Sequence, residues 1–202
     1  MSNAPPSCFS KNTLLSVLPA SSAALLDKHI EPIECELRRE LASAGESMKF
    51  VYIPTGGCVS MIRRLVDGRG AEVGLVGREG IVGLPVLMGN EISYVDALVQ
   101  VPGTMLRLPA EALRRVCRDD MFLHQHHLRY ALVFPNVATQ SAVCNGNHAL
   151  EQRAARWLLM MHDRAEAQDV LAMLLAVHRP AVNITARLFQ QTGLINYGNG
   201  HL

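Results

Sequence analysis

Residues 50–80 read FVYIPTGGCVSMIRRLVDGRGAEVGLVGREG, and this stretch carries the strongest fold signal in the chain. Its first apolar run ends at Pro54 before the turn pair Gly56-Gly57, and its second ends at Asp67-Gly68. An Asp-Gly pair between two strand-like runs is a strong hairpin signal, because tight hairpin turns need the positive φ that these residues tolerate. We therefore predict antiparallel strands over 50–54, 58–66 and 71–76.

Further short apolar runs follow this stretch. After a Gly-rich loop, residues 97–101 and 105–108 form two runs separated by Pro102-Gly103. The pattern shows no helices between the runs, and strands of this length at near-regular spacing indicate an antiparallel roll or barrel. Upstream, residues 12–30 predict short helical turns, with Pro19 opening the second of them.

The chain becomes helical after Pro109, which itself stands at a predicted helix start. Asp119 or Asp120 is placed to cap a long helix that reaches about Val143. Its apolar residues recur every three to four positions, as expected for a core stripe or for a seam with a partner helix. These residues are Leu128, Leu132, Val133, Val137 and Ala138. Pro135 should bend this helix, because proline removes a backbone donor.

Three more helices are predicted towards the C-terminus, over 148–162, 170–177 and 180–191. The first has one apolar face, made of Leu150, Ala154, Trp157, Leu158 and Met161. The other two have the arrangement of a helix-turn-helix, whose second helix fits the DNA major groove. Residues 170–202 contain Arg179 and Arg187 and no Asp or Glu, which favours phosphate binding. Two ordinary antiparallel helices would produce the same spacing.

The amino-acid composition excludes several classes of function for this chain. The 202 residues are 49% hydrophobic and 18% charged, with a net charge of +1, so the chain can bury a sizeable core. This charge excludes a uniformly basic coat for nucleic acids, and 5% aromatic residues argue against a single-strand stacking platform. The N-terminus does not resemble a signal peptide, and no apolar run is long enough to cross a bilayer. We expect a soluble cytoplasmic protein with no membrane partner.

The side chains that carry reactive chemistry are scattered. Five cysteines without a CxxC pair predict reduced intracellular thiols, with Arg114, Arg115 and Arg118 near Cys117 as a partial exception. The cluster His124, His126 and His127 is expected to be an exposed polar patch, and a cupin-type metal enzyme is the alternative. Glu72 and Glu79 are expected to be surface charges, with Arg78-Glu79 a structural or solvated ion pair. We predict no catalytic residue, no metal site and no enzymatic activity.

Several stretches resemble the Crp/Fnr transcriptional regulators, and most closely a bacterial subgroup without an assigned effector. Residues 144–164 resemble the linker helix of this family, and residues 167–182 with 189–195 resemble its helix-turn-helix. The stretches 52–54, 57–60, 72–80 and 83–85 resemble its cyclic-nucleotide-binding-like roll.

The resemblance implies an α+β fold with an antiparallel β-roll or jelly roll, a long dimerisation helix and a C-terminal winged helix-turn-helix. The implied domains are a sensor roll over 12–118, a dimerisation helix over 119–143 and a DNA-binding domain over 144–202.

The chain departs from the family pattern at two places. Only Ala165-Glu166 stand between Arg164 and the residues that match the DNA module, where relatives have a longer segment with a short strand. The sequence stops at residues 198–202, where the second strand of the wing would start, so the wing is expected to be incomplete. These departures keep an alternative open: a ligand-binding roll with a degenerate, non-DNA-binding module.

The expected effector loop lacks the charges that bind a cyclic nucleotide in the family. Val82 stands where the acid that takes the ribose hydroxyl is expected, and residues 90–96 contain no arginine. A buried phosphate without a cation is costly, so the sequence argues against cyclic AMP as a cofactor in the usual mode. The effector, if there is one, is expected at Val73, Gly80, Val82, Gly83, Leu84 and Tyr94.

The first hypothesis is a homodimeric, sequence-specific transcriptional regulator. Its expected partners are double-stranded DNA and a second copy of the chain, with RNA polymerase as a further candidate. Arg179 and Asn183 are expected at base edges, because a guanidinium fits guanine and an amide fits adenine. Phosphate contacts are expected from His178, Thr185 and Arg187. The dimer seam is expected at Leu128, Leu132, Val133, Val137 and Ser141.

Overall fold

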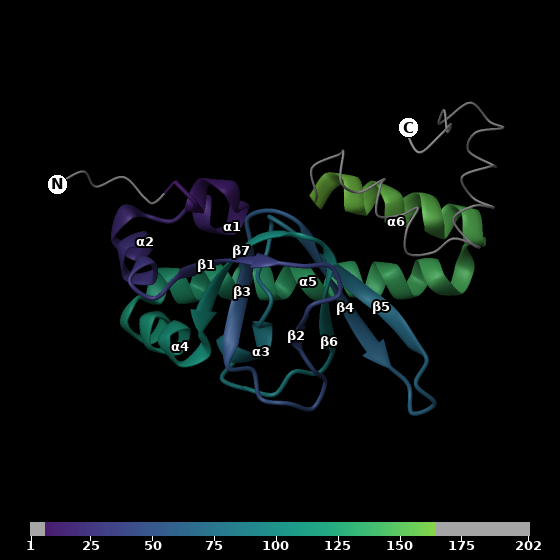
Figure 1. Ribbon diagram of the computed structural model, residues 1–202, viewed down its shortest axis with the longest axis horizontal. Helices are drawn as coiled ribbons and strands as arrows, with labels where there is room; N and C mark the ends of the chain where they lie inside the picture. The colour runs from purple at the N-terminus through teal and green to yellow at the C-terminus, as the bar shows by residue number, and fades with distance from the viewer. Residues whose placement is uncertain (1–6, 165–202) are drawn as a thin grey trace.

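The structure, a computed structural model, describes residues 7–164 of the chain. Its helices and strands are labelled in Figure 1. The first half contains η1 (Phe9–Lys11), α1 (Thr13–Ser16), α2 (Ala20–Asp27), β1 (Glu31–Cys35), β2 (Glu40–Ala42), β3 (Phe50–Pro54), β4 (Cys58–Arg64) and β5 (Gly70–Val76). The second half contains α3 (Leu84–Leu87), β6 (Asp96–Val101), β7 (Gly103–Pro109), α4 (Ala110–Asp119), α5 (Met121–Asn147) and α6 (Leu150–Arg164).

The strands form two antiparallel sheets, and the roll predicted from the sequence is confirmed. One sheet has the order β1-β7-β3 and the other the order β2-β6-β4-β5. The hairpin of β4 and β5 pairs Val59 with Val76 and Arg64 with Gly70, and turns at Gly68, whose φ is +83°. Both sheets contribute to one apolar core, with Ile53 and Leu106 from one sheet and Val59 from the other fully buried.

The sequence pattern did not predict strands β1 and β2 or the short helix α3. β1 contains Pro32 and is exposed along most of its length, because it pairs only with β7 at the edge of its sheet. β2 has three residues and a shifted register against β6. The expectation of strands without intervening helices is wrong at α3, a single turn that lies within the Gly-rich loop.

The helices begin close to the predicted positions. Pro19 precedes α2, and Pro109 precedes α4. The side chain of Asp120 caps α5 by accepting a hydrogen bond from the backbone N–H of Leu123 (3.1 Å). The structure assigns one helix through Pro135 to Asn147, beyond the expected end at Val143. His148 is the C-cap residue of α5. The next helix starts at Leu150, two residues after the predicted start.

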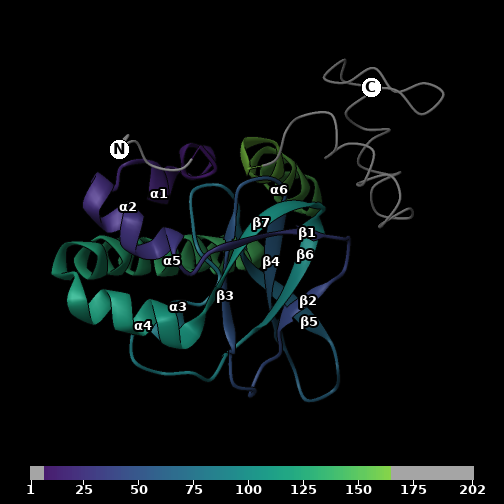
Figure 2. The same cartoon turned by 60° about the vertical axis from the view of Figure 1, so that its left-hand side comes forward.

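The two long helices lie against the same sheet of the roll. Both views show α5 running across the width of the roll and α6 folded back beside its C-terminal half (Figures 1 and 2). α5 and α6 both contact β5, while α4 packs on α3, α5 and β7. The two long helices therefore cover the same side of the four-stranded sheet. The candidate site lies on this side of the roll.

Candidate functional site

A cavity of about 370 Å³ lies between the roll and α5. The buried side chains of Met48, Met61 and Ile81 form its floor. Met88 and Tyr94, which are 59% and 57% exposed, mark its mouth. The other lining residues are Val76, Gly83, Leu84, Pro85, Asn90, Ser93, Val95 and Phe134. Strand, loop and helix thus enclose one space of the size that small ligands occupy, about 300–1,000 Å³.

The structure brings half of the expected effector residues to this cavity. Gly83, Leu84 and Tyr94 line it. Val82 faces the core instead, and its backbone exchanges two hydrogen bonds with Tyr52 (2.8 and 3.0 Å). The other two expected residues also lie outside the lining, since Gly80 contacts Tyr130 and Val73 packs half-buried against the core.

Several lining residues were missed by the sequence analysis. Met48 precedes β3, Met61 lies in β4, and Phe134 belongs to α5, so they come together only through the tertiary fold. No local pattern separates these residues from ordinary core positions. Phe134 matters most, because it joins the cavity to the helix with the predicted dimer seam.

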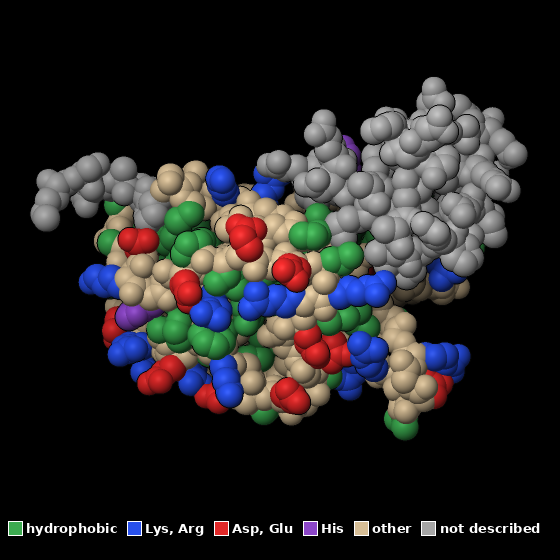
Figure 3. Space-filling model, in the orientation of Figure 1, with side chains coloured by type: hydrophobic (Ala, Val, Ile, Leu, Met, Phe, Trp, Pro, Cys, Tyr) green, Lys and Arg blue, Asp and Glu red, His purple; other side chains and the backbone are tan. Residues whose placement is uncertain are grey.

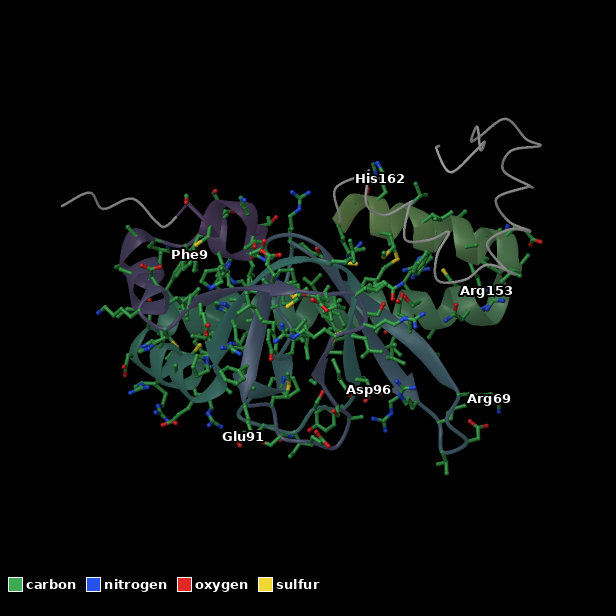
Figure 4. The ribbon with its side chains drawn as sticks, in the orientation of Figure 1. Phe9, Arg69, Glu91, Asp96, Arg153 and His162 are labelled. Carbon is green, nitrogen blue, oxygen red and sulfur yellow. The ribbon has the colours of Figure 1, made fainter. Side chains whose placement is uncertain are left out.

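The polar groups of the lining are largely satisfied by one another. Ser93 donates from Oγ to the carbonyl oxygen of Val95 (2.6 Å), and Asn90 accepts from the backbone N–H of Ile92 (3.0 Å) and donates to the Tyr94 hydroxyl. Among the described residues, none that lines the cavity is charged. The neighbouring acids have partners outside it: Glu91 pairs with Arg114, and Asp96 pairs with Arg64. Figure 4 shows Glu91 and Asp96 at the lower side of the roll.

Three glycines at a spacing of three residues let the helices approach β5 and the loop after it. A Cβ at Gly74 would stand 2.9 Å from the Phe134 ring, and one at Gly77 would stand 2.6 Å from Cβ of Arg164. A Cβ at Gly80 would collide with the hydroxyl of Tyr130. The repeat of Gly74, Gly77 and Gly80 is the sequence signal that could have located this contact line.

Polar bonds hold α6 to the roll. Trp157 donates from its indole nitrogen to Glu72 (2.9 Å), and the Ser60 hydroxyl donates to the same carboxylate. Burial raises the pKa of Glu72, although these hydrogen bonds oppose the shift. Arg164 pairs with Glu79 at 2.7 Å. The expectation of two surface charges is therefore wrong, and the partner of Glu79 is Arg164 instead of Arg78.

The predicted seam residues divide between two faces of α5. Leu132 and Val133 are 75% and 55% exposed, while Leu128 and Val137 are partly buried. Ser141 is buried within the chain, where it donates to the carbonyl oxygen of Val137 and accepts from Arg156 (3.2 Å). Its place against α6 removes it from the exposed face. Val143, at 51% exposure, extends that face instead.

The three histidines do not form an exposed patch. His126 contacts the carbonyl oxygen of Leu14 (2.8 Å), and His124 lies 3.4 Å from that of Leu87. His127 is fully buried, and its ring Nδ1 lies 2.8 Å from the carbonyl oxygen of Leu123. Its Nε2 has no hydrogen-bond partner in the described part of the chain. Burial lowers the pKa of His127 to about 4, so the ring stays neutral near pH 7.

We expect His127 to make the fold sensitive to acid. A base whose pKa falls on folding contributes stability above its unfolded value near 6.5, and this stability is lost as pH falls towards 4. The full loss amounts to about 3 kcal/mol. A His127→Leu variant should lose that much less unfolding free energy between pH 7 and pH 4, as urea titrations would show. The control His124→Leu retains His127 and should keep the wild-type loss; equal acid losses in the two variants would contradict the assignment.

Within the described residues, neither the buried cysteines Cys58 and Cys117 nor the possible metal ligands are arranged for reactive chemistry. Burial raises the pKa of Cys58 and of Cys117 to about 12, so these thiols stay protonated and the arginines near Cys117 do not activate it. Within residues 7–164, no group of three or more His, Cys, Asp or Glu side chains is arranged to hold a metal ion. The same part of the chain contains no helix that is long and apolar enough to span a membrane.

The residues expected to touch DNA lie outside the described residues. They are His178, Arg179, Asn183, Thr185 and Arg187. The two helices predicted for the helix-turn-helix also fall there. On the face of the roll shown in Figure 3, Lys and Arg side chains alternate with Asp and Glu, so this face offers no surface of one sign.

An antiparallel roll with a helical turn in its Gly-rich loop and a long helix closing one side defines a class of domain. Residues 34–120 match the family model of the cyclic nucleotide-binding domain. These matched residues form most of the antiparallel roll, and the long helix α5 follows it, so the expected α+β fold is confirmed to this extent.

Among solved structures, the chain is similar to FixK2 from Bradyrhizobium japonicum, with 15% identity, a TM-score of 0.67, and coverage of 84% of this chain and 89% of that one. It is also similar to CLP, the c-di-GMP responsive global regulator of Xanthomonas campestris, with 15% identity, a TM-score of 0.64, and coverage of 90% and 96%. A putative cAMP-binding regulatory protein from Silicibacter pomeroyi DSS-3 has 19% identity, a TM-score of 0.54, and coverage of 92% and 87%. A search of curated proteins found no match. At these identities the likeness concerns the fold alone.

Proposed function

We propose that this protein is a homodimeric, sequence-specific DNA-binding transcriptional regulator of the Crp/Fnr type. In this proposal, residues 12–118 form the sensor roll and residues 144–202 the DNA-binding domain. Residues 119–143 form the dimerisation helix, which corresponds to most of α5. The protein acts by binding and not by catalysis, with double-stranded DNA and a second copy as partners and RNA polymerase as a further candidate.

The observation that carries this proposal is that the roll covers only one face of α5 and leaves apolar side chains exposed on the other. One face of this 27-residue helix packs on the roll through Leu123, His127 and Ala131, which are buried. The opposite side exposes Leu132, Val133 and Val143. An apolar row on a helix of this length is well suited to isologous pairing, which would bury it twice and set the spacing of two C-terminal modules.

Two further observations support the same function. The fold is shared with FixK2 and CLP, both Crp/Fnr-family regulators. The sequence from 167 to 195 resembles the DNA module of that family, and it provides Arg179 and Asn183 for base edges and Arg187 for a phosphate. The predicted module is acid-free from residue 170 onward, whereas Lys and Arg on the visible face of the roll are interleaved with acids.

Selection of binding sites from random duplex DNA tests this function. We expect a pseudo-palindromic site with half-sites about 34 Å apart, and an affinity that falls steeply as salt rises. Protein that selects no sequence and binds no duplex at low salt would refute the proposal. That outcome would favour the alternative of a ligand-binding roll with a degenerate module.

We expect Arg179→Ala to weaken binding to the selected site by about 1–3 kcal/mol and to relax one base position. The matched control is Arg187→Ala, which should weaken specific and random duplexes alike and reduce the salt slope by about one. Fluorescence anisotropy with both duplexes measures the difference. An equal loss on both duplexes for Arg179→Ala would leave that residue only a phosphate contact.

A further inference from the structure

The cavity between the roll and α5 has the chemistry of an apolar binding site. Three methionines and the ring of Phe134 contribute to its lining, and unbranched thioether side chains adapt well to irregular apolar shapes. These residues are Met48, Met61, Met88 and Phe134. The floor is apolar, whereas the polar groups of Asn90, Ser93 and Tyr94 already bond to one another or to nearby backbone.

An anionic ligand is unsuited to this cavity. A phosphate taken out of water needs a cation or several hydrogen-bond donors. None of the described lining residues is charged. Arg63 reaches the mouth but donates to the backbone carbonyl of Tyr94, and Arg64 is engaged by Asp96. One polar group remains for a ligand at the mouth, since the Tyr94 hydroxyl accepts from Asn90 and keeps its own proton to donate.

We propose that this cavity binds an uncharged, largely apolar small molecule, with its apolar body against the methionines and Phe134 and one acceptor atom near the Tyr94 hydroxyl. The ligand would fill the space of about 370 Å³ between the loop and α5. The ligand class follows from the cavity alone; its role as the effector rests on the proposed function.

A ligand in this position would contact the helix of the proposed dimer directly. Phe134 forms one wall of the cavity and also packs on Gly74 of β5 without space to spare. Its neighbour Val133 is exposed on the other side of α5. A molecule that displaces the Phe134 ring therefore shifts the helix, because Gly74 leaves the ring no room to retreat towards the sheet.

Binding of the uncharged apolar dye N-phenylnaphthylamine to the full chain tests the proposal. We expect a saturable rise in fluorescence that decanol reverses and cyclic AMP does not. The variant Leu84→Trp, which fills the cavity, should weaken dye binding by about tenfold or more. Val95→Phe fills the same space with a smaller change and serves if the tryptophan variant does not fold.

The matched control is Leu65→Trp. Leu65 is exposed beside the β4–β5 turn and does not line the cavity. This variant should bind the dye as the wild type does. Displacement of the dye by cyclic AMP, equal binding by the Leu84 and Leu65 variants, or the absence of saturable binding would each overturn the ligand class. Since no DNA is present, these outcomes are independent of a failure of the proposed function.

Discussion

A Leu132→Glu variant is expected to be monomeric at concentrations at which the wild-type chain is a dimer. Leu132 is 75% exposed on the outer side of α5, at the centre of the proposed seam. In a two-fold pair the substitution places two carboxylates close together in an apolar contact. An unpaired buried charge costs about 4 kcal/mol, which corresponds to about a thousandfold in the dimer dissociation constant. Sedimentation equilibrium measures this change.

DNA affinity of the same variant should fall in parallel, because two linked modules bind a two-part site far more tightly than one. Val66→Glu is the matched control, since Val66 is fully exposed in the β4–β5 hairpin, away from α5. Figure 4 shows the neighbouring Arg69 at the tip of that hairpin. The control should stay dimeric and bind DNA normally. A monomeric wild type, or a Leu132→Glu dimer with unchanged binding, would place the interface elsewhere.

Gly57→Ala is expected to lower the free energy of unfolding by about 4 kcal/mol. Gly57 joins β3 to β4 with a φ of +71°, a conformation that side chains rarely adopt. A Cβ there would also stand 2.7 Å from the carbonyl oxygen of Pro102 and closer still to that of Val101. Both are backbone atoms, of the last residue of β6 and of the residue that links β6 to β7, so neither can move without disturbing these strands. Urea unfolding measures the loss.

The contribution of the collision is separated from that of the backbone angle by Gly68→Ala. Gly68 has a φ of +83°, but nothing lies within 4 Å of its Cβ position. We therefore expect Gly68→Ala to lower the free energy of unfolding only by the conformational contribution, about 1 kcal/mol. Equal losses for the two alanine variants would show that the contact with Val101 and Pro102 relaxes and that the turn conformation alone matters.

Structural features that depend on residues close together in the sequence were predictable from the sequence. The hairpin follows from Asp67-Gly68 between two apolar runs, and the start of α5 follows from the capping carboxylate of Asp120, whose hydrogen bond spans three residues. Both signals act locally, so the sequence alone carries them. β1 was missed because its ladder bonds come from β7, more than sixty residues away, and not from its own pattern of Pro and Glu.

The sequence by itself determined the roll, the long helix and the absence of an arginine from residues 90–96, because turns, caps and composition are local properties. Only the tertiary structure decided which side of each element meets the others. It placed Phe134 in the wall of the cavity, buried His127 with no partner for Nε2 within residues 7–164, and turned Glu72 towards Trp157. A helical or alternating pattern shows which residues share one face of a helix or strand. Packing between distant segments decides which of these faces is buried away from water. That choice sets the chemistry of the site.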